Sequence, residues 1–282
     1  MTQWNLIIDV SLCENCNNCV LVAKDELVGN DFPGFSAAMP ASGRGVIRIE
    51  RHTRGSGHHV DVTHWPVLCN HCRDAPCVRA GGGAVTRRPD GIVVFDPAKV
   101  KGRRDLLDSC PYGALVWNET AQVPQNWFFD AHLLDVGSKE PRCVGVCPTR
   151  AIEAVKSDDS SMVARAAREG LQTLQPELGT HPRVYYRHLE RLQTVFVAGS
   201  VAYRDAQGRA ECLQGASVAL TGQGRAVASA TTDAYGDFRV DGLPIGSGPG
   251  ALMVTHPQHG SWTRSIVIGN HCVVVPDIEL GA

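Results

Sequence analysis

Short runs of alternating hydrophobic and polar residues, separated by glycines, fill the chain from about residue 193 to its C-terminus. A period of two places every second side chain on one face of a β-strand. About seven short strands within about 90 residues are typical of a small β-sandwich. The predicted strands lie at 195–199, 216–220, 226–230, 237–240, 251–255 and 265–268.

The preceding segment, 158–175, has helical rather than alternating spacing. Its apolar residues recur at intervals of three and four, Ser160 or Ser161 can cap the helix, and Pro176 is expected to end it. A strand is expected at Val184–Tyr186, returning to the N-terminal domain. The apolar positions of the helix are Val163, Ala166, Ala167, Leu171 and Leu174.

Before residue 157 the informative pattern is that of cysteine. Nine of the eleven cysteines lie within the first 147 residues. They include a C-x2-C-x2-C run from Cys13 to Cys19 and a C-x2-C-x4-C run from Cys69 to Cys77. Each run has a remote partner that precedes proline, Cys147 or Cys110. Three thiolates on a loop and one remote thiolate are what a cubane iron–sulfur cluster requires, so the pattern predicts electron transfer.

An internal repeat relates the two halves of this region. The stretch 7–13 aligns with 94–100, and Cys110–Leu115 resembles Cys147–Ile152. The pattern predicts a duplicated ferredoxin ancestor with four cluster sites, in which each run gives its last cysteine to the other cluster. Two ligand sets are complete: Cys13, Cys16, Cys19 and Cys147 for cluster 1, and Cys69, Cys72, Cys77 and Cys110 for cluster 2.

The other two sets have lost their ligands together. The third site has Gly81, Val100, Arg103 and Leu106 at its four ligand positions, and none of these can bind iron. The fourth site has Ala23, Trp127, Asp130 and Cys143, so only one thiol remains there. Asp130 could in principle bind iron beside Cys143, but we expect it to pair with a base or to cap the turn before Ala131. We therefore predict two [4Fe-4S] clusters.

Other chemistry fits the cysteines less well. Zinc sites usually combine two C-x2-C pairs, or cysteine pairs with histidine pairs, and a disulfide framework suits short secreted chains. A solvated loop explains His58 and His59 more simply than metal binding does. Cys212 and Cys272 are expected to be buried thiols. The chain offers no nucleophile–base pair and no phosphate-binding loop, so we expect no catalysis by this chain itself.

The composition and the N-terminal sequence bear on the partners and the cellular location of the chain. The chain has 282 residues, 43% hydrophobic and 20% charged, with a formal net charge of −2, which gives no reason to expect a nucleic-acid partner. We see no signal peptide and no apolar run of the ~20 residues that a membrane helix needs, so we expect no membrane association. Oxygen-sensitive clusters and unpaired thiols favour the cytoplasm.

We therefore expect an α+β chain that consists of a duplicated 2[4Fe-4S] ferredoxin-like domain and an all-β sandwich. The predicted boundaries are 1–157 for the iron–sulfur domain (insertion 31–65, second half 66–118), 158–192 for a helix and connecting strand, and 193–282 for the sandwich. The sandwich resembles the transthyretin-like or carboxypeptidase-regulatory-like modules, in Gly215–Leu220, Thr231–Phe238 and Gly242–Pro244. We expect it to dock a partner or to give structural support.

The cysteine pattern also resembles the iron–sulfur subunits of molybdopterin oxidoreductases of the DMSO reductase family. The segments that carry the resemblance are Cys16–Cys19, Ala75–Val78, Asp90–Val93, Leu106–Ala114, Ala131–Asp135, Pro176–Thr180 and Pro182–Tyr186. The chain is closer still to transhydroxylase-like members, whose small subunit also ends in a β-sandwich but is understood to keep three clusters. Here Trp127-Phe128-Phe129 offers the bulk to fill the fourth site.

The resemblance implies a role in a complex. A large partner subunit would carry the molybdopterin, with molybdenum or tungsten, and would act on polyhydroxylated aromatics, while this chain relays or stores electrons in a heterodimer or a multiple of it. Two alternatives stay open. The same relay could serve another reductase or dehydroxylase of the family, or the clusters could be structural in a scaffold subunit.

Overall fold

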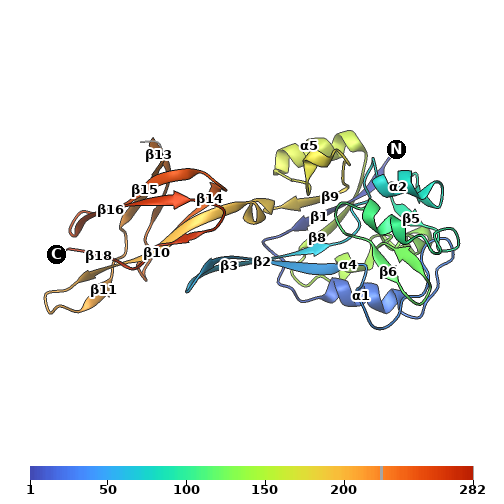
Figure 1. Ribbon diagram of the computed structural model, residues 1–282, viewed down its shortest axis with the longest axis horizontal. Helices are drawn as coiled ribbons and strands as arrows, with labels where there is room; N and C mark the ends of the chain where they lie inside the picture. Colours follow the sequence, from blue (N-terminus) through green and yellow to red (C-terminus); the bar gives the residue numbers. More distant parts are fainter. Residues whose placement is uncertain (223–224, 282) are drawn as a thin grey trace. The chain divides into compact units, whose positions relative to one another are not determined.

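A computed structural model describes residues 1–222 and 225–281, and the chain divides into two compact units. The first consists of Met1–Arg51 with His64–Leu189, and the second of His52–Thr63 with the residues from Glu190 on. Both units are rich in short strands, and the helices are few and short (Figure 1). Residues 52–63, inside the predicted insertion, belong with the second unit.

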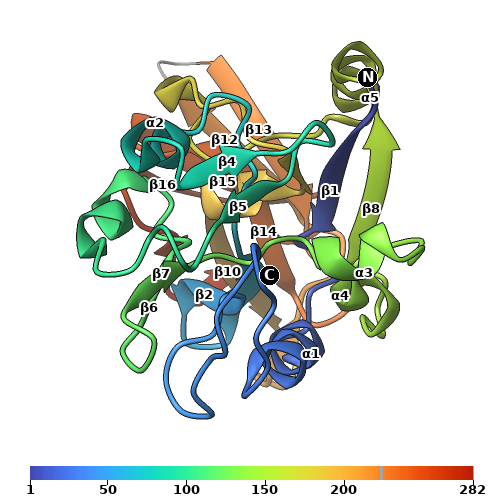
Figure 2. The ribbon, with the colours of Figure 1, turned by 90° about the vertical axis from the view of Figure 1, so that its right-hand side faces the viewer.

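A three-stranded sheet with the order β8-β1-β9 organises the first unit, and Figure 2 shows β1 beside β8. The central strand β1 carries Leu6, Ile7 and Ile8, whose side chains are all fully buried. The elements of this unit are β1 (Gln3–Asp9), α1 (Asn18–Leu27), α2 (Pro76–Gly81), β4 (Val85–Arg87), β5 (Val93–Phe95), η1 (Arg104–Ser109), β6 (Val116–Asn118), β7 (Val123–Gln125), α3 (Ala131–Asp135), α4 (Arg142–Gly145), β8 (Ile152–Ser157), α5 (Asp159–Glu169), η2 (Pro176–Leu178) and β9 (Val184–Arg187).

The helix and strand predicted after residue 157 are both present, with different ends. α5 is capped by Asp158 rather than by a serine, because its carboxylate accepts the backbone N–H of Ser161 at 2.9 Å. The helix ends at Gly170, with φ +64°, well before Pro176. The strand expected at Val184–Tyr186 is β9, which pairs in parallel with β1.

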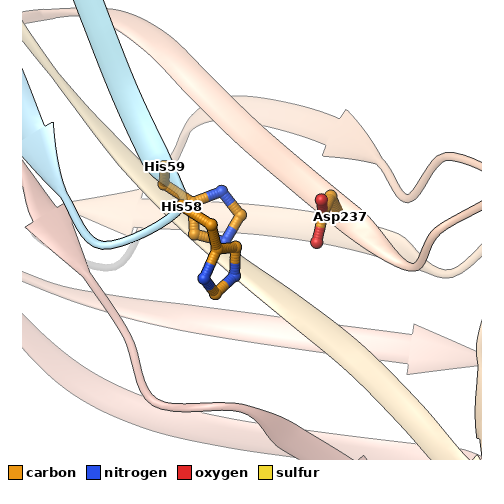
Figure 3. Close-up of side chains that lie close together, drawn as sticks. All are labelled: His58, His59 and Asp237. Carbon is orange, nitrogen blue, oxygen red and sulfur yellow. The ribbon is translucent and has the colours of Figure 1, made fainter.

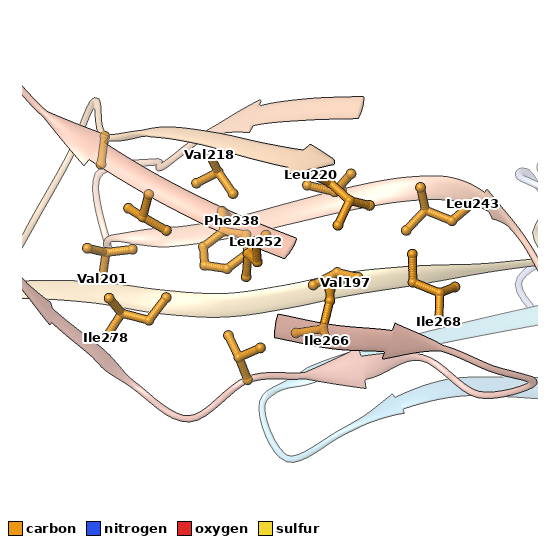
Figure 4. Close-up of a cluster of buried hydrophobic side chains, with 14 of the residues drawn as sticks. Val197, Val201, Val218, Leu220, Phe238, Leu243, Leu252, Ile266, Ile268 and Ile278 are labelled. Atoms are coloured by element: carbon orange, nitrogen blue, oxygen red, sulfur yellow. The ribbon is translucent and has the colours of Figure 1, made fainter. Parts of the chain in front are cut away.

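The second unit is a sandwich of two sheets. One has the order β11-β10-β14, with β17 and β18 also paired to β10, and the other has the order β13-β12-β15-β16. Their facing residues form one apolar core, with Val197, Val218, Leu220 and Leu252 fully buried (Figure 4). Its elements are η3 (Leu189–Leu192), β10 (Thr194–Arg204), β11 (Ala210–Cys212), β12 (Ser217–Gly222), β13 (Arg225–Thr231), β14 (Asp237–Pro244), β15 (Gly248–His256), β16 (Gly260–Ile268), β17 (Val273–Val274) and β18 (Ile278–Leu280).

All six strands predicted in this region are present. The prediction that both of its cysteines are buried was wrong for Cys212, which is exposed on β11, and Cys272 is partly buried. β11 is a short edge strand that pairs with Ala202–Arg204 of β10, and all three of its residues are exposed.

A β-hairpin forms the later part of the predicted insertion. Its strands are β2 (Arg48–Ser56) and β3 (His59–Val67), so the strand predicted at 46–49 begins two residues later and is longer. The hairpin tip, residues 52–63, packs within the second unit. Its buried Arg54 guanidinium binds Asp61 at 2.8 Å and Asp241 of β14 at 3.0 Å. His58 lies exposed in the turn of this hairpin, and His59, which is partly buried, begins β3.

Across residues 1–222 and 225–281, no helix combines the length and the apolar character needed to cross a membrane.

Candidate metal centres

The first group of thiols is assembled by the pairing of β1 with β8. Cys13 lies just after β1, and Cys147 lies just before β8, where Ile8 pairs with Ile152. The backbone N–H of Asp9 donates to the carbonyl of Ala151 at 2.8 Å, which brings the two chain segments side by side. The remote cysteine thus reaches the N-terminal loop because an antiparallel ladder fixes both segments.

The loop from Cys13 to Cys19 turns through two left-handed residues, Asn15 and Asn17, at φ 57° and 62°. Asparagine tolerates this conformation better than most residues do, which suits so tight a loop. The side-chain amide of Asn18 donates to the carbonyl of Val146 at 3.2 Å and holds the loop against the Cys147 segment. Burial raises the pKa of Cys13 and, to about 12, that of Cys19, and the neighbouring thiols of the group add smaller increases.

The second group of thiols surrounds one cavity in the first unit. Cys69, Cys72, Cys77 and Cys110 all line it, and Leu115 is among the apolar residues beside them. The run from Cys69 to Cys77 leads into α2, and Cys110 directly follows η1. This is the arrangement expected from the spacing: three thiols on one loop and a fourth from a distant Cys-Pro.

Burial is the main cause of the raised pKa values of Cys69, Cys72 and Cys77. It raises the pKa of Cys77 to about 12 and that of Cys72 to about 11, in each case as the largest effect. The Thr180 hydroxyl, by hydrogen bonding to Cys72, acts in the opposite direction. Tyr112 contacts the same hydroxyl at 2.5 Å, so Tyr112, Thr180 and Cys72 form a continuous polar chain beside the cavity.

The chemistry of both donor sets fits a thiolate-bound metal cluster. Buried thiols stay protonated at neutral pH unless a cation stabilises the thiolate, and four soft donors facing one point are suited to iron or zinc. Since Cys69 and Cys77 are fully or almost fully buried, their ionisation requires such a cation.

Two of the four residues expected at the third, lost site lie inside an apolar cluster. Val100 and Leu106 are fully buried there, next to Cys72 and Cys77. Gly81 has no room for a larger side chain, because an added Cβ would lie 2.6 Å from the side chain of Val85. Arg103 is partly exposed, pairs with Asp105 at 2.7 Å and donates to the carbonyl of Ala80 at 3.2 Å. Hydrocarbon therefore fills this position.

Three of the four residues expected at the fourth site, Trp127, Asp130 and Cys143, interact with one another beside a group of buried aromatic rings. Trp127, Phe128 and Phe129 are each about 1% exposed, and the rings of Trp127 and Phe129 lie 4.8 Å apart. Asp130 and the buried Cys143 lie close enough for the carboxylate to raise the pKa of the thiol, after the larger effect of burial.

Our expectation for Asp130 was wrong in its partner. Its carboxylate neither pairs with a base nor caps the turn before Ala131; instead it accepts the backbone N–H of Arg142, the first residue of α4, at 2.8 Å. Sequence reasoning also missed Thr180 and Tyr112. Tyr112 follows the Cys110-Pro111 pair and could have been noticed, but Thr180 comes from a segment with no cysteine nearby.

Comparisons with known proteins agree with this chemistry. A family profile for a 4Fe-4S dicluster domain matches residues 60–157. The pyrogallol hydroxytransferase small subunit of Pelobacter acidigallici is 43% identical over 99% of this chain and 100% of its own length.

More distant relatives match about two thirds of the chain. An iron–sulfur subunit of Halobacterium salinarum, named for dimethyl sulfoxide reductase, is 30% identical over 66% of this chain and 79% of its own. A sulfite dehydrogenase subunit of Allochromatium vinosum is 32% identical over 66% of this chain and 83% of its own. Among solved structures, the 5-hydroxyisourate hydrolase of Klebsiella pneumoniae covers 31% of this chain and 92% of its own at 18% identity, with a TM-score of 0.25, which is too low to bear on the fold.

Proposed function

The chain belongs to the family of iron–sulfur small subunits of molybdopterin oxidoreductase complexes, and on that basis we propose that it holds two [4Fe-4S] clusters that exchange electrons with a larger catalytic partner. It is an electron-transfer subunit, and catalysis lies in the partner. The observation that carries the proposal is the convergence of two separate groups of four thiols, each built from one loop and one remote Cys-Pro.

We assign the ligands from those groups. Cluster 1 is held by Cys13, Cys16, Cys19 and Cys147, and cluster 2 by Cys69, Cys72, Cys77 and Cys110. When bound, each cluster supplies one-electron transfer at a potential set by burial and by hydrogen bonds to sulfur. The protein contributes the ladder between β1 and β8, the apolar wall around the second cavity and the polar chain through Thr180.

Matching turns support the proposed duplication of the cluster domain. The carboxylate of Asp9 accepts the N–H of Ser11 at 2.9 Å, and Asp96, at the aligned position, accepts that of Ala98 at 3.1 Å. After each remote cysteine the chain makes the same turn. The N–H of Gly113 donates to the Cys110 carbonyl at 3.1 Å and that of Arg150 to the Cys147 carbonyl at 3.2 Å, with φ 56° and 55° at the two donors.

The partner and substrate follow from the nearly full-length relative. By its name that protein is part of an enzyme acting on pyrogallol. We propose a large subunit with molybdopterin that acts on polyhydroxylated aromatics, in a heterodimer or a multiple of it, in the cytoplasm. The predicted domain boundaries belong to the same proposal, with a transthyretin-like sandwich as the docking or supporting module.

A second candidate function is favoured by the more distant relatives. The subunits that match at 30–32% identity come, by their names, from reductases and dehydrogenases of sulfur compounds. In that case the same two clusters would pass electrons between a partner and an external carrier. The full-length match, which includes the sandwich, favours the aromatic substrate.

The direct experiment is anaerobic co-expression of this chain with its large partner. We expect co-purification in equal amounts, about eight irons and eight sulfides per small subunit, and an electron paramagnetic resonance signal of reduced clusters that changes when pyrogallol is added. If the resonance signal of the clusters did not change with any substrate of the partner, electron transfer through this chain would be contradicted. Conversion of a phenol by the isolated small subunit would contradict its role as a non-catalytic subunit.

A further inference from the structure

Two adjacent histidines at the tip of the β2–β3 hairpin face a carboxylate of the sandwich. His58 lies in the turn and His59 begins β3, while Asp237 begins β14 (Figure 3). The candidate ligand atoms of the three side chains all lie within 4.8 Å of one another, and the imidazole rings are 4.2 Å apart. All three residues belong to the second unit, which contains none of the eight thiols assigned above.

Ser200 of β10 sits at the centre of this group. Its hydroxyl lies 3.2 Å from Nε2 of His58 and 3.3 Å from Nε2 of His59, and it donates to Asp237 Oδ1 at 2.5 Å. In a tetrahedral zinc site with bonds of about 2.0–2.1 Å, neighbouring ligand atoms are about 3.3 Å apart. The two distances from the Ser200 hydroxyl to the histidine nitrogens already match this spacing between ligand atoms.

The group is held in place from both sides. In the β10–β14 ladder Ser200 pairs directly with Asp237, whose own N–H donates to Asp233 at 3.0 Å. On the hairpin, the buried Arg54 guanidinium binds Asp61, Asp241 and the carbonyl of Thr194. Small side-chain rotations are then enough to bring three donors onto one ion.

The arrangement does not suit nucleophilic catalysis. In a serine hydrolase the carboxylate orients the histidine and the histidine takes the serine proton. Here the serine donates to the carboxylate itself, and both histidines compete for the same hydroxyl.

We propose that His58, His59 and Asp237 bind one Zn²⁺ ion, with Ser200 or water as the fourth donor. Two imidazoles and one carboxylate are donors that favour the binding of zinc, whereas magnesium and calcium favour sites made of oxygen donors alone. The ion would clip the hairpin tip to β10 and β14, adding a metal link to the ion pairs of Arg54. Such a site is independent of the clusters in ligands, donor type and unit.

The test is zinc binding to the full chain, purified with its clusters and its partner and then stripped of loosely bound metal. When zinc is added back, we expect the stripped complex to take up one Zn²⁺ per small subunit, and we expect its iron content to stay unchanged. The X-ray absorption fine structure at the zinc edge should show nitrogen and oxygen ligands at about 2.0–2.1 Å, with the scattering pattern of imidazole. It should show no sulfur ligand at about 2.3 Å. Sulfur ligands would mean that zinc had entered a cysteine site and would overturn the proposal.

Variants separate this site from other histidines. The double change His58→Gln/His59→Gln should weaken zinc binding more than about tenfold, as should Asp237→Asn, which keeps a group for the Ser200 hydroxyl. His256→Gln/His259→Gln is the matched control: these two histidines, with rings 5.0 Å apart, also lie in the second unit and should be dispensable. Equal zinc binding by the first double variant and the parent, or none by the parent at micromolar zinc, would refute the site.

Discussion

The backbone N–H of Arg142 donates a hydrogen bond to Asp130 Oδ2 at 2.8 Å. This bond ties the aromatic segment that ends at Phe129 to the first turn of α4, which carries the buried Cys143. The carboxylate is thus engaged with the backbone, in agreement with our expectation that Asp130 does not bind iron. This contact lies where the repeat pattern would place a fourth cluster.

The first prediction is that Asp130→Ala leaves the clusters intact but weakens the fold. The iron content should stay at about eight per chain, while the loss of the acceptor leaves a buried N–H unpaired at a cost of about 1–3 kcal/mol. Asp130→Asn, which can still accept that N–H, is the control. Iron analysis and thermal unfolding of the anaerobic protein check both. Loss of a distinct cluster signal in the alanine variant would show that Asp130 is a ligand.

The second prediction concerns pH. Burial raises the pKa of Asp130 above its usual value, so the folded state binds this proton more tightly than the unfolded chain does. The contribution of this residue to stability therefore falls as pH rises from the unfolded pKa through the folded one. The advantage of Asp130→Asn over the parent in unfolding temperature should be larger at pH 8 than at pH 5. An advantage that shrinks with rising pH would contradict this sign.

The spacing of the cysteines was enough to anticipate both thiol groups, because a tight loop can present only closely spaced residues and a remote Cys-Pro must supply the fourth donor. It could not reveal the role of Thr180, which hydrogen-bonds to Cys72 from a segment without cysteines. The strands of the sandwich were predictable from alternation. The place of the hairpin tip beside β10 and β14 was not predictable, because it depends on Arg54. This charged residue lies in a polar stretch of the sequence and becomes buried only through its ion pairs with Asp61 and Asp241.

The third prediction separates ligand from non-ligand cysteines. Cys77→Ala should remove one cluster and lower the iron content from about eight to about four per chain. Cys143→Ala is the matched control, since this thiol is equally buried but lies beside Asp130 in the filled site. Iron and sulfide analysis with electron paramagnetic resonance distinguishes the two. A parallel loss of iron in both variants would put Cys143 among the ligands.

The fourth prediction is a shift in the potential of cluster 2. The Thr180 hydroxyl interacts with Cys72, and a hydrogen bond to a ligand sulfur stabilises the more negative, reduced cluster. Thr180→Val, similar in shape, should lower the reduction potential by on the order of 50 mV, since a tenfold change in a one-electron equilibrium is about 59 mV. Redox titration of the complex measures it, and cluster 1 is the internal control. An unchanged potential would mean that the hydroxyl serves Tyr112 alone.

The fifth prediction tests how closely the hairpin tip packs in the second unit. Gly55 has φ +83°, a region that other residues rarely adopt, and an added Cβ would overlap the carbonyl oxygen of His59 and lie 2.5 Å from the ring of Phe196. That ring is buried and has the guanidinium of Arg239 4.0 Å above it, so it cannot easily move. Gly55→Ala should therefore destabilise the second unit by about 1–3 kcal/mol, the range for strained backbone and overpacking.

Gly57→Ala provides the comparison for this fifth prediction. Gly57 also has positive φ, +60°, but nothing lies within 4 Å of its added Cβ, so only backbone strain should count. Thermal unfolding of the two variants, with iron content as a check on the first unit, separates strain from collision. Equal effects at the two positions would mean that the tip is not packed against Phe196, and the anchoring of the His58–His59 turn would then lose its physical basis.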